Sequence, residues 1–221
     1  MLIGSPAGRA ANDNNGSQDE KRMIEIGLKI SPVHLNMAGK DPDMVGLGSY
    51  LVNAVGDCDG CHTSGGPPNF NYANGNNPYF NQHPAKIDPN TYLGGGADFG
   101  PAIPPMTPGQ YVGPDIIVRN LTPDKIGLAT GTAEGHNTLA QFLQIIKTGV
   151  DLDHVHPTCT ILSPPTPANC IPAPVDGNLL QIMPWPIFAN MTDRQLTAIY
   201  TYLTAIPCVE GGPGEPSPRC H

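Results

Sequence analysis

Basic side chains are scarce in this sequence. Charged residues make up 14% of the 221 residues, and 11 Lys and Arg stand against 19 Asp and Glu, which gives a formal net charge of -8. Proteins that bind nucleic acid need a basic face that neutralises phosphates. The composition therefore argues against a nucleic-acid partner and favours partner proteins with basic or neutral surfaces.

Long apolar runs are missing as well. No stretch approaches the roughly 20 consecutive apolar residues of a membrane-spanning helix, so the sequence predicts no transmembrane segment. The N-terminal residues also lack the apolar core of a secretory signal. Since 39% of the residues are hydrophobic and 26 are proline, we expect one domain with long loops.

One short motif carries the chemistry of the chain, Cys58-Asp59-Gly60-Cys61-His62. Two thiols separated by two residues can each add to a vinyl group of one porphyrin, and the next side chain then lies under the iron. A histidine at that place is an axial ligand, and C-x-x-C-H is a haem attachment signal. The alternative is a redox or zinc C-x-x-C with a chance histidine. A zinc site needs a second ligand pair and a thioredoxin-type motif needs a strand before it, and neither is evident here.

Four further cysteines remain, and an even number in an exported chain predicts two disulfides. Sequence alone permits three pairings, and the short separations favour Cys159 with Cys170 and Cys208 with Cys220. Covalent haem attachment of this kind requires export, so the expected location is the periplasm or another exported compartment. We therefore expect a signal peptide that is not part of this sequence.

The hydrophobic pattern predicts three core helices. Residues 43–55, 137–147 and 192–203 each carry apolar side chains at helical spacing. Thr192 and Gln195 form a capping box at the start of the last of them.

An acidic residue and two glycines indicate where these helices begin or end and where two of them approach each other. Asp43 is the expected N-cap of the first helix, and Gly149 the expected C-cap of the second. Gly48 lies on the apolar face of the first helix. Its missing side chain would let that helix approach the last one near Ile199 or Tyr202.

The remaining segments divide the chain into three parts. Residues 1–42 are expected to form an N-terminal arm, flexible in its first half, and a surface segment. Residues 43–207 form the haem domain, and residues 208–221 a tail. Residues 63–119 show no convincing periodicity and could hold a short β-hairpin near 116–118. The expected fold class is all-α, as a single domain with long Pro- and Gly-rich loops.

The second axial ligand decides the function, because a second protein ligand suits electron transfer and an open site suits oxygen or peroxide chemistry. Met183 is the best candidate, since Pro184 restricts it to extended backbone in a rigid loop. Such a loop can hold a weak thioether against iron. The other candidates are Met106, His83, His136, His154 and His156.

Hydrogen-bond donors near these segments could bind the haem propionates. The candidates are Arg119, Asn120 and Trp185. A separate polar cluster could bind a cation or form a solvated turn. Its members are Asp151, Asp153, His154 and His156.

Three segments add to the haem motif. They are Gly48-Ser49-Tyr50-Leu51-Val52, Asn120-Leu121-Thr122-Pro123-Asp124, and Met183-Pro184-Trp185 ahead of Leu196 to Leu203. Together they resemble class I c-type cytochromes, and more narrowly the haem modules of the cytochrome subunits of bacterial membrane-bound alcohol and sugar-acid dehydrogenases. The resemblance implies a cytochrome c-like domain whose first and last helices cross. It also implies axial ligands at His62 and Met183, and thioether bonds at Cys58 and Cys61. Those subunits carry three such modules, whereas this chain carries one.

The sequence therefore predicts an electron carrier with one covalently attached haem c and its iron, and not an enzyme. It would pass single electrons between a dehydrogenase or quinol-oxidising complex and a terminal acceptor, as a free protein or as a subunit. Two alternatives stay open. One is a haem enzyme or gas sensor with an open or displaceable sixth site, and the other is a structural haem subunit of a larger assembly.

Overall fold

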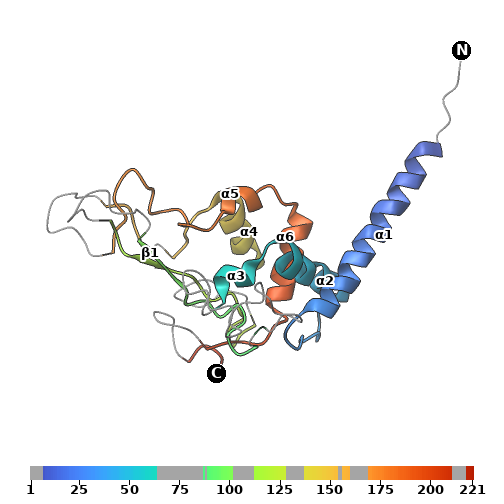
Figure 1. Cartoon of the computed structure of the whole chain (residues 1–221), viewed down its shortest axis with the longest axis horizontal. Coiled ribbons are helices and arrows are strands. Elements are labelled where there is room, and N and C mark those ends of the chain that lie inside the picture. The colour runs from blue at the N-terminus through green and yellow to red at the C-terminus, as the bar shows by residue number, and fades with distance from the viewer. Residues whose placement is uncertain are drawn as a thin grey trace, which may run out of the picture.

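The computed structural model describes residues 7–63, 87, 89–101, 112–127, 137–153, 156–159, 169–210 and 218–221, with side chains described from residue 16 onward. Within these ranges the chain forms α-helices, one π-helical turn and two strands. They are α1 (Ala7–Ile30), α2 (Pro42–Tyr50), the π-helical η1 (Leu51–Val55), α3 (Cys58–His62), β1 (Asp98–Pro101), β2 (Asp115–Ile117), α4 (Leu139–Thr148), α5 (Trp185–Phe188) and α6 (Asp193–Leu203). Figure 1 shows α1 at one end of the molecule, the other helices in the middle and the strands toward the opposite end.

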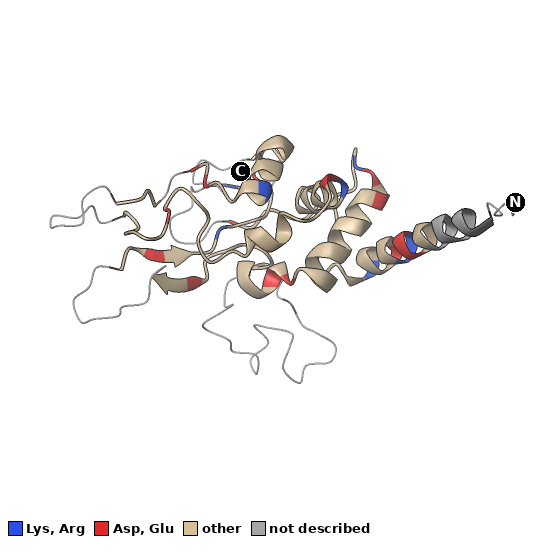
Figure 2. Ribbon diagram, turned by 90° about the horizontal axis from the view of Figure 1, so that it is seen from above, with Lys and Arg blue, Asp and Glu red and all other residues tan. Residues whose placement is uncertain are grey.

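The predicted all-α class is wrong, because the described chain is mixed. β1 and β2 pair antiparallel, with Asp98 opposite Ile117 and Pro101 opposite Asp115. The β-structure expected near 116–118 is present, but its partner strand lies in a stretch that shows no periodicity in the sequence. Strands of four and three residues are too short to show the two-residue alternation that identifies a strand in a sequence. Both strands carry acidic and no basic side chains (Figure 2).

α2 and α6 pack directly against each other through Gly48. An added Cβ there would overlap the carbonyl oxygen of Ala198 and lie 2.7 Å from the Cβ of Tyr202. Only glycine permits this approach of the two backbones. The prediction that Gly48 faces the last helix near Tyr202 is therefore confirmed.

Two details of the first core helix differ from the prediction. Its N-cap is Asp41 instead of Asp43, and the Asp41 carboxylate accepts a hydrogen bond from the Asp43 N–H at 3.0 Å. Val55, predicted for the apolar face, is 61% exposed. The chain passes into the π-helical turn from Leu51 onward, and the wider turn moves the following residues off the face of the α-helix.

The ends of α4 and α6 follow the local sequence closely. Thr192 and Gln195 form the predicted capping box at the start of α6. Thr138 and Gln141 form a second capping box at the start of α4. Gly149 ends α4 in the left-handed region, with φ of 72°, which confirms it as the C-cap. These contacts join near neighbours in the chain, so local sequence suffices to predict them.

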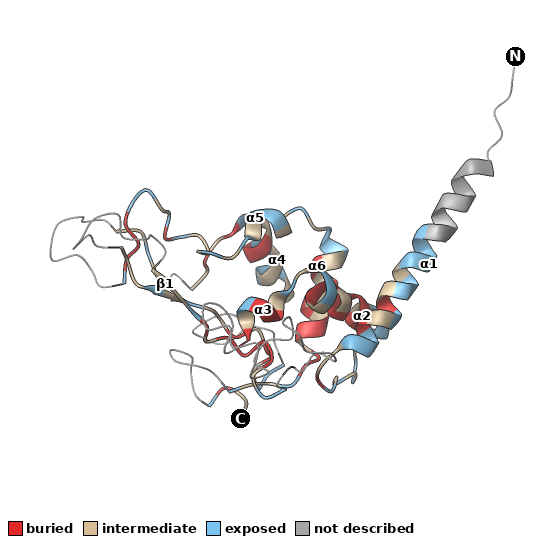
Figure 3. Ribbon diagram, viewed as in Figure 1, coloured by how far each residue is buried: buried red, intermediate tan, exposed pale blue. Residues whose placement is uncertain are grey.

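α1 covers much of the stretch predicted as a flexible arm, so that prediction is wrong for these residues. Its N-terminal turns project away from the rest of the molecule (Figure 1), and residues 16–22 are mostly exposed (Figure 3). Its last turns pack on α2, where Ile24 is buried and a Cβ at Gly27 would overlap the carbonyl oxygen of Gly46. Asn, Asp, Gly and Ser are poor helix formers, and the contacts of the last turns with α2 join segments that the sequence pattern does not relate, so the sequence does not predict this helix.

A buried polar network runs through the core between α1, α2, η1 and α6. The Tyr92 hydroxyl donates to Oδ1 of Asn53 at 2.5 Å and lies 2.9 Å from the hydroxyl of Tyr202. Nδ2 of Asn53 donates to the Ser49 carbonyl at 3.0 Å, and the Ser49 hydroxyl donates to the Gly27 carbonyl at 2.6 Å. The network fixes the helices directly ahead of the haem motif.

Both favoured disulfides are present, Cys159–Cys170 and Cys208–Cys220. Structural disulfides persist in oxidising compartments, so they indicate an oxidising, exported environment. None of the helices in the described ranges is both long enough and apolar enough to span a bilayer.

Candidate functional site

The haem motif forms the short helix α3. Asp57 precedes it in the left-handed region, with φ of 47°, and turns the chain from η1 into the new helix. Cys58 and Cys61 are three residues apart on this helix, so both thiols lie on one side of it. Neither is in a disulfide, although the four other cysteines are paired. Both are therefore available for a covalent bond to one ligand.

The surroundings of the two thiols in the motif disfavour a thioredoxin-type redox role. Burial, with the charges of Asp59 and Asp57, raises the pKa of Cys58 to about 12. Burial also raises the pKa of Cys61. Thioredoxin-type cysteines act as thiolates and have lowered pKa values. The surroundings thus favour neutral thiols over a redox C-x-x-C.

His62 is oriented by a hydrogen bond from its ring to the backbone. Its Nδ1 lies 2.8 Å from the carbonyl oxygen of Arg119. A carbonyl can only accept, so Nδ1 carries the proton and Nε2 keeps its lone pair for a metal. Burial lowers the pKa of His62, which favours the neutral imidazole that metal ions require. This donor set fits a haem iron.

Residues 93–96 and the segment of Arg119 hold His62 in place. The role of residues 93–96 is one that the sequence does not reveal. The N–H of Gly95 donates to the His62 carbonyl at 2.7 Å, and the N–H of Leu93 donates to Oγ1 of Thr63 at 3.1 Å. Gly95 has φ of 70°, and an added Cβ would lie 2.5 Å from the carbonyl carbon of Arg119. The glycine run at 94–96 therefore packs against the segment that orients His62.

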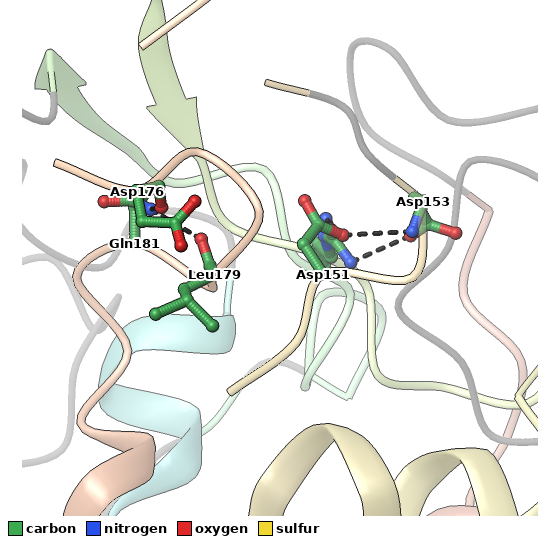
Figure 4. Close-up of polar contacts among 6 residues, drawn as sticks. Asp151, Asp153, Asp176, Leu179 and Gln181 are labelled. Carbon is green, nitrogen blue, oxygen red and sulfur yellow. Dashed lines mark hydrogen bonds and ion pairs between the residues drawn. The ribbon is translucent and has the colours of Figure 1, made fainter. Parts of the chain in front are cut away.

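The Arg119 side chain binds two carboxylates, which differs from the predicted propionate contact. Its guanidinium lies 2.7 Å from Oδ1 of Asp151 and 2.8 Å from Oδ2 of Asp153, and Figure 4 shows both carboxylates in these ion pairs. The predicted cation cluster is changed by the same contact, because its carboxylates hold Arg119. His154 lies outside the described residues, and His156 is half-buried. Among the described side chains no group of three or more His, Cys, Asp or Glu could hold a metal ion.

Asn120 and Trp185, the two other predicted propionate partners, have structural contacts. Asn120 is fully buried; its Oδ1 accepts from the N–H and hydroxyl of Thr122, and its Nδ2 donates to the Val209 carbonyl at 2.9 Å. It therefore fixes the turn after Arg119 to the C-terminal tail. Trp185 packs on Gly149, where an added Cβ would lie 2.6 Å from Cζ2 of the indole.

Met183 lies in a bend just ahead of α5. Its N–H donates to the Gln181 carbonyl at 2.6 Å, its own carbonyl accepts from the Trp185 N–H at 2.8 Å, and its side chain is half-buried. Downstream, Phe188 of α5 lies 4.0 Å from the place that a Cβ of Gly56 would occupy. The segment that follows Met183 thus reaches Gly56, two residues ahead of Cys58. Met106, His83 and His136, the competing ligands, lie outside the described residues.

Asp59 should make the stability of the chain depend on pH. Burial, with the nearby charge of Asp57, raises the pKa of its carboxyl from 3.8 to about 6. Below about pH 4, the ordinary pKa, Asp59 is protonated in both the native and the unfolded state. Between about pH 4 and 6 only the native state keeps the proton. The free energy of unfolding therefore falls as the pH rises through that window. The loss at neutral pH is on the order of 3 kcal/mol. Asp59→Asn should remove it, which urea unfolding at several pH values would measure; an unchanged pH profile would contradict this assignment.

Comparisons with known proteins identify no relative. No protein-family model, no curated protein and no solved structure matches the chain.

Proposed function

We propose that the chain is a c-type cytochrome, an electron carrier that binds one haem covalently through Cys58 and Cys61. His62 and Met183 are the axial ligands in this proposal. The observation that carries it is the hydrogen bond from His62 Nδ1 to the Arg119 carbonyl. His62 lies on the same short helix as two cysteines that form no disulfide. That hydrogen bond keeps the lone pair of Nε2 for a metal ion, as the outer hydrogen bond of a metal-ligating histidine does.

The residues around the motif suit this role. When bound, the haem supplies one-electron chemistry at its iron. Cys58 and Cys61 hold it to the chain, while the Arg119 carbonyl fixes the ring orientation of His62 and raises its basicity as a ligand. Met183 would close the opposite face and exclude small ligands from it.

The location and partners follow from the charge and the disulfides. The oxidising environment that the disulfides indicate includes the bacterial periplasm, which is the proposed location. A net charge of -8 favours a basic docking surface on the partner. The proposed partners are a dehydrogenase or quinol-oxidising complex as electron donor and a terminal acceptor protein.

The direct test is to export the chain into a bacterial periplasm that contains the haem attachment machinery. Mass spectrometry of the purified protein should show one haem per chain that survives denaturation, and its pyridine haemochrome spectrum should be that of haem c. Cys58→Ser with Cys61→Ser is the matched control and should carry none. A folded, disulfide-bonded wild-type chain without covalent haem would refute the proposal.

Met183 can be tested in the same haem-loaded protein. The reduced wild-type protein should be low-spin and should not bind carbon monoxide at neutral pH, because the thioether occupies the sixth position. Met183→Ala should bind carbon monoxide rapidly, whereas Met44→Ala, which removes a methionine that packs on the helical core, should not. Rapid binding by the wild type would favour the alternative of a haem enzyme or gas sensor. A Met183→Ala protein that stayed closed would transfer the ligand role to Met106.

A further inference from the structure

Arg119 lies at the junction of two parts of the site. Its backbone carbonyl accepts the hydrogen bond from His62 Nδ1 at 2.8 Å. Its guanidinium binds the carboxylates of Asp151 and Asp153 at 2.7 and 2.8 Å. One residue therefore contacts the proposed proximal ligand through its main chain and a distant loop through its side chain.

The carboxylate side of this junction leads to the segment of Met183. The Asp151 N–H donates to the Asn178 carbonyl at 2.8 Å, and the Leu180 N–H donates to the Gly149 carbonyl at 2.7 Å. Between these bonds, residues 150 and 179 form an antiparallel bridge. The stretch that begins three residues before Met183 is thus aligned with the loop whose carboxylates hold Arg119.

The ion pairs are largely shielded from water. The side chains of Asp151 and Asp153 are 6% and 9% exposed, and that of Arg119 is 23% exposed. Asp151 is held further, because its Oδ1 also accepts the N–H of Asp153 at 3.1 Å. Buried ion pairs add little net stability compared with apolar residues of similar size, but they impose a defined geometry, and the loss of one partner is disruptive.

We propose that Arg119, Asp151 and Asp153 form a positioning device, the Arg119 clamp, that holds the two axial-ligand segments in register. The clamp fixes the carbonyl that orients His62 and ties it to the loop aligned with the Met183 segment. This inference rests on the proposed function, because it assigns a role toward the bound haem.

The clamp can be tested in the haem-loaded full-length protein with Asp151→Asn and, as a milder variant, Asp153→Asn. Asp193→Asn is the matched control: it removes the same charge from a carboxylate whose side chain is 80% exposed and which pairs with Lys147. Two quantities are measured, the exchange rate of the His62 Nδ1 proton by NMR and the imidazole concentration that displaces the sixth ligand. In the clamp variants exchange should be about tenfold faster, and displacement should need about tenfold less imidazole, as expected for the loss of one hydrogen bond to a charged group. The control should match the wild type.

Arg119→Gln separates geometry from charge. It keeps the main chain but removes a positive charge, whereas Asp151→Asn removes a negative one. If the clamp acts through position, both substitutions change proton exchange and imidazole displacement in the same direction. If these residues act only through charge, the two substitutions move the reduction potential in opposite directions and leave proton exchange unchanged, which would overturn the inference.

The outcomes also distinguish this inference from the proposed function. A wild-type chain without covalent haem overturns both. A haem-loaded wild type whose clamp variants behave like Asp193→Asn overturns the clamp and leaves the proposed function intact. If Asp151→Asn fails to fold, Asp153→Asn decides, because it leaves the contact between Arg119 and Asp151 in place.

Discussion

Replacing Gly48 by valine should lower the free energy of unfolding by about 1 to 3 kcal/mol, the usual cost of overpacking a close contact. The added side chain would overlap the Ala198 carbonyl and lie 2.6 Å from its carbon. These are main-chain atoms, so no side-chain rotation can relieve the overlap and α2 must move away from α6. The shift would also strain the network of Tyr92, Asn53 and Tyr202, because Asn53 lies in η1, which continues α2, and Tyr202 lies in α6.

Urea unfolding monitored by circular dichroism measures this effect as a lower midpoint. Gly16→Ala is the matched control, because Gly16 also lies within a helix but an added Cβ there meets nothing within 4 Å. The control should be neutral or more stable by up to about 1 kcal/mol, since alanine is the better helix former. Equal midpoints for Gly48→Val and the wild type would show that α2 and α6 do not pack through Gly48.

Removing the Cys208–Cys220 disulfide should cost more than removing Cys159–Cys170. The two bonds close loops of similar length, with sequence separations of 12 and 11, so the loss of chain entropy is about 3 kcal/mol for either one. The tail disulfide, however, also holds Arg219, whose guanidinium donates to the Thr122 carbonyl. Arg219 is 3% exposed, and its release would expose the turn that follows Arg119.

Paired serine substitutions at each disulfide provide the comparison. Both double variants should unfold at lower temperature, and the tail variant should also alter the visible spectrum or reduction potential of the bound haem. The loop variant is the control for loss of a disulfide in general. Equal losses of stability together with unchanged haem properties in the tail variant would contradict a link between the tail and the site.

Most of the features that can be predicted from sequence are set by residues that are near neighbours in the chain. The capping box of Thr192, the C-cap at Gly149 and both disulfides depend on residues a short distance apart. The approach of Gly48 to the last helix is also predictable, because a glycine on an apolar helix face costs stability unless another backbone approaches closely there. The strands and α1 are not predictable, since the strands are too short for a pattern and the first turns of α1 are rich in poor helix formers.

The candidate site likewise combines residues that the sequence predicts with a contact that it does not predict. Cys58, Cys61 and His62 are recognisable because covalent haem attachment, the proposed chemistry, requires this spacing. The contact between Arg119 and Asp151 joins residues 32 positions apart, and no property of either segment indicates the other. Taken alone, the two segments predict separate ligands for Arg119 and Asp151, a propionate and a cation, whereas the structure pairs the two residues with each other.

The position of α2 between α1 and α6 has a consequence for the order in which the chain folds. Gly46 faces α1 and Gly48 faces α6, and the bond from Asn53 to Tyr202 spans 149 residues. Contacts between such distant residues form slowly, because a long loop must close before they contribute. We expect the helices around the motif to reach their final packing only after nearly the whole chain is available. Until then Cys58 and Cys61 remain accessible, as the proposed covalent attachment of haem requires.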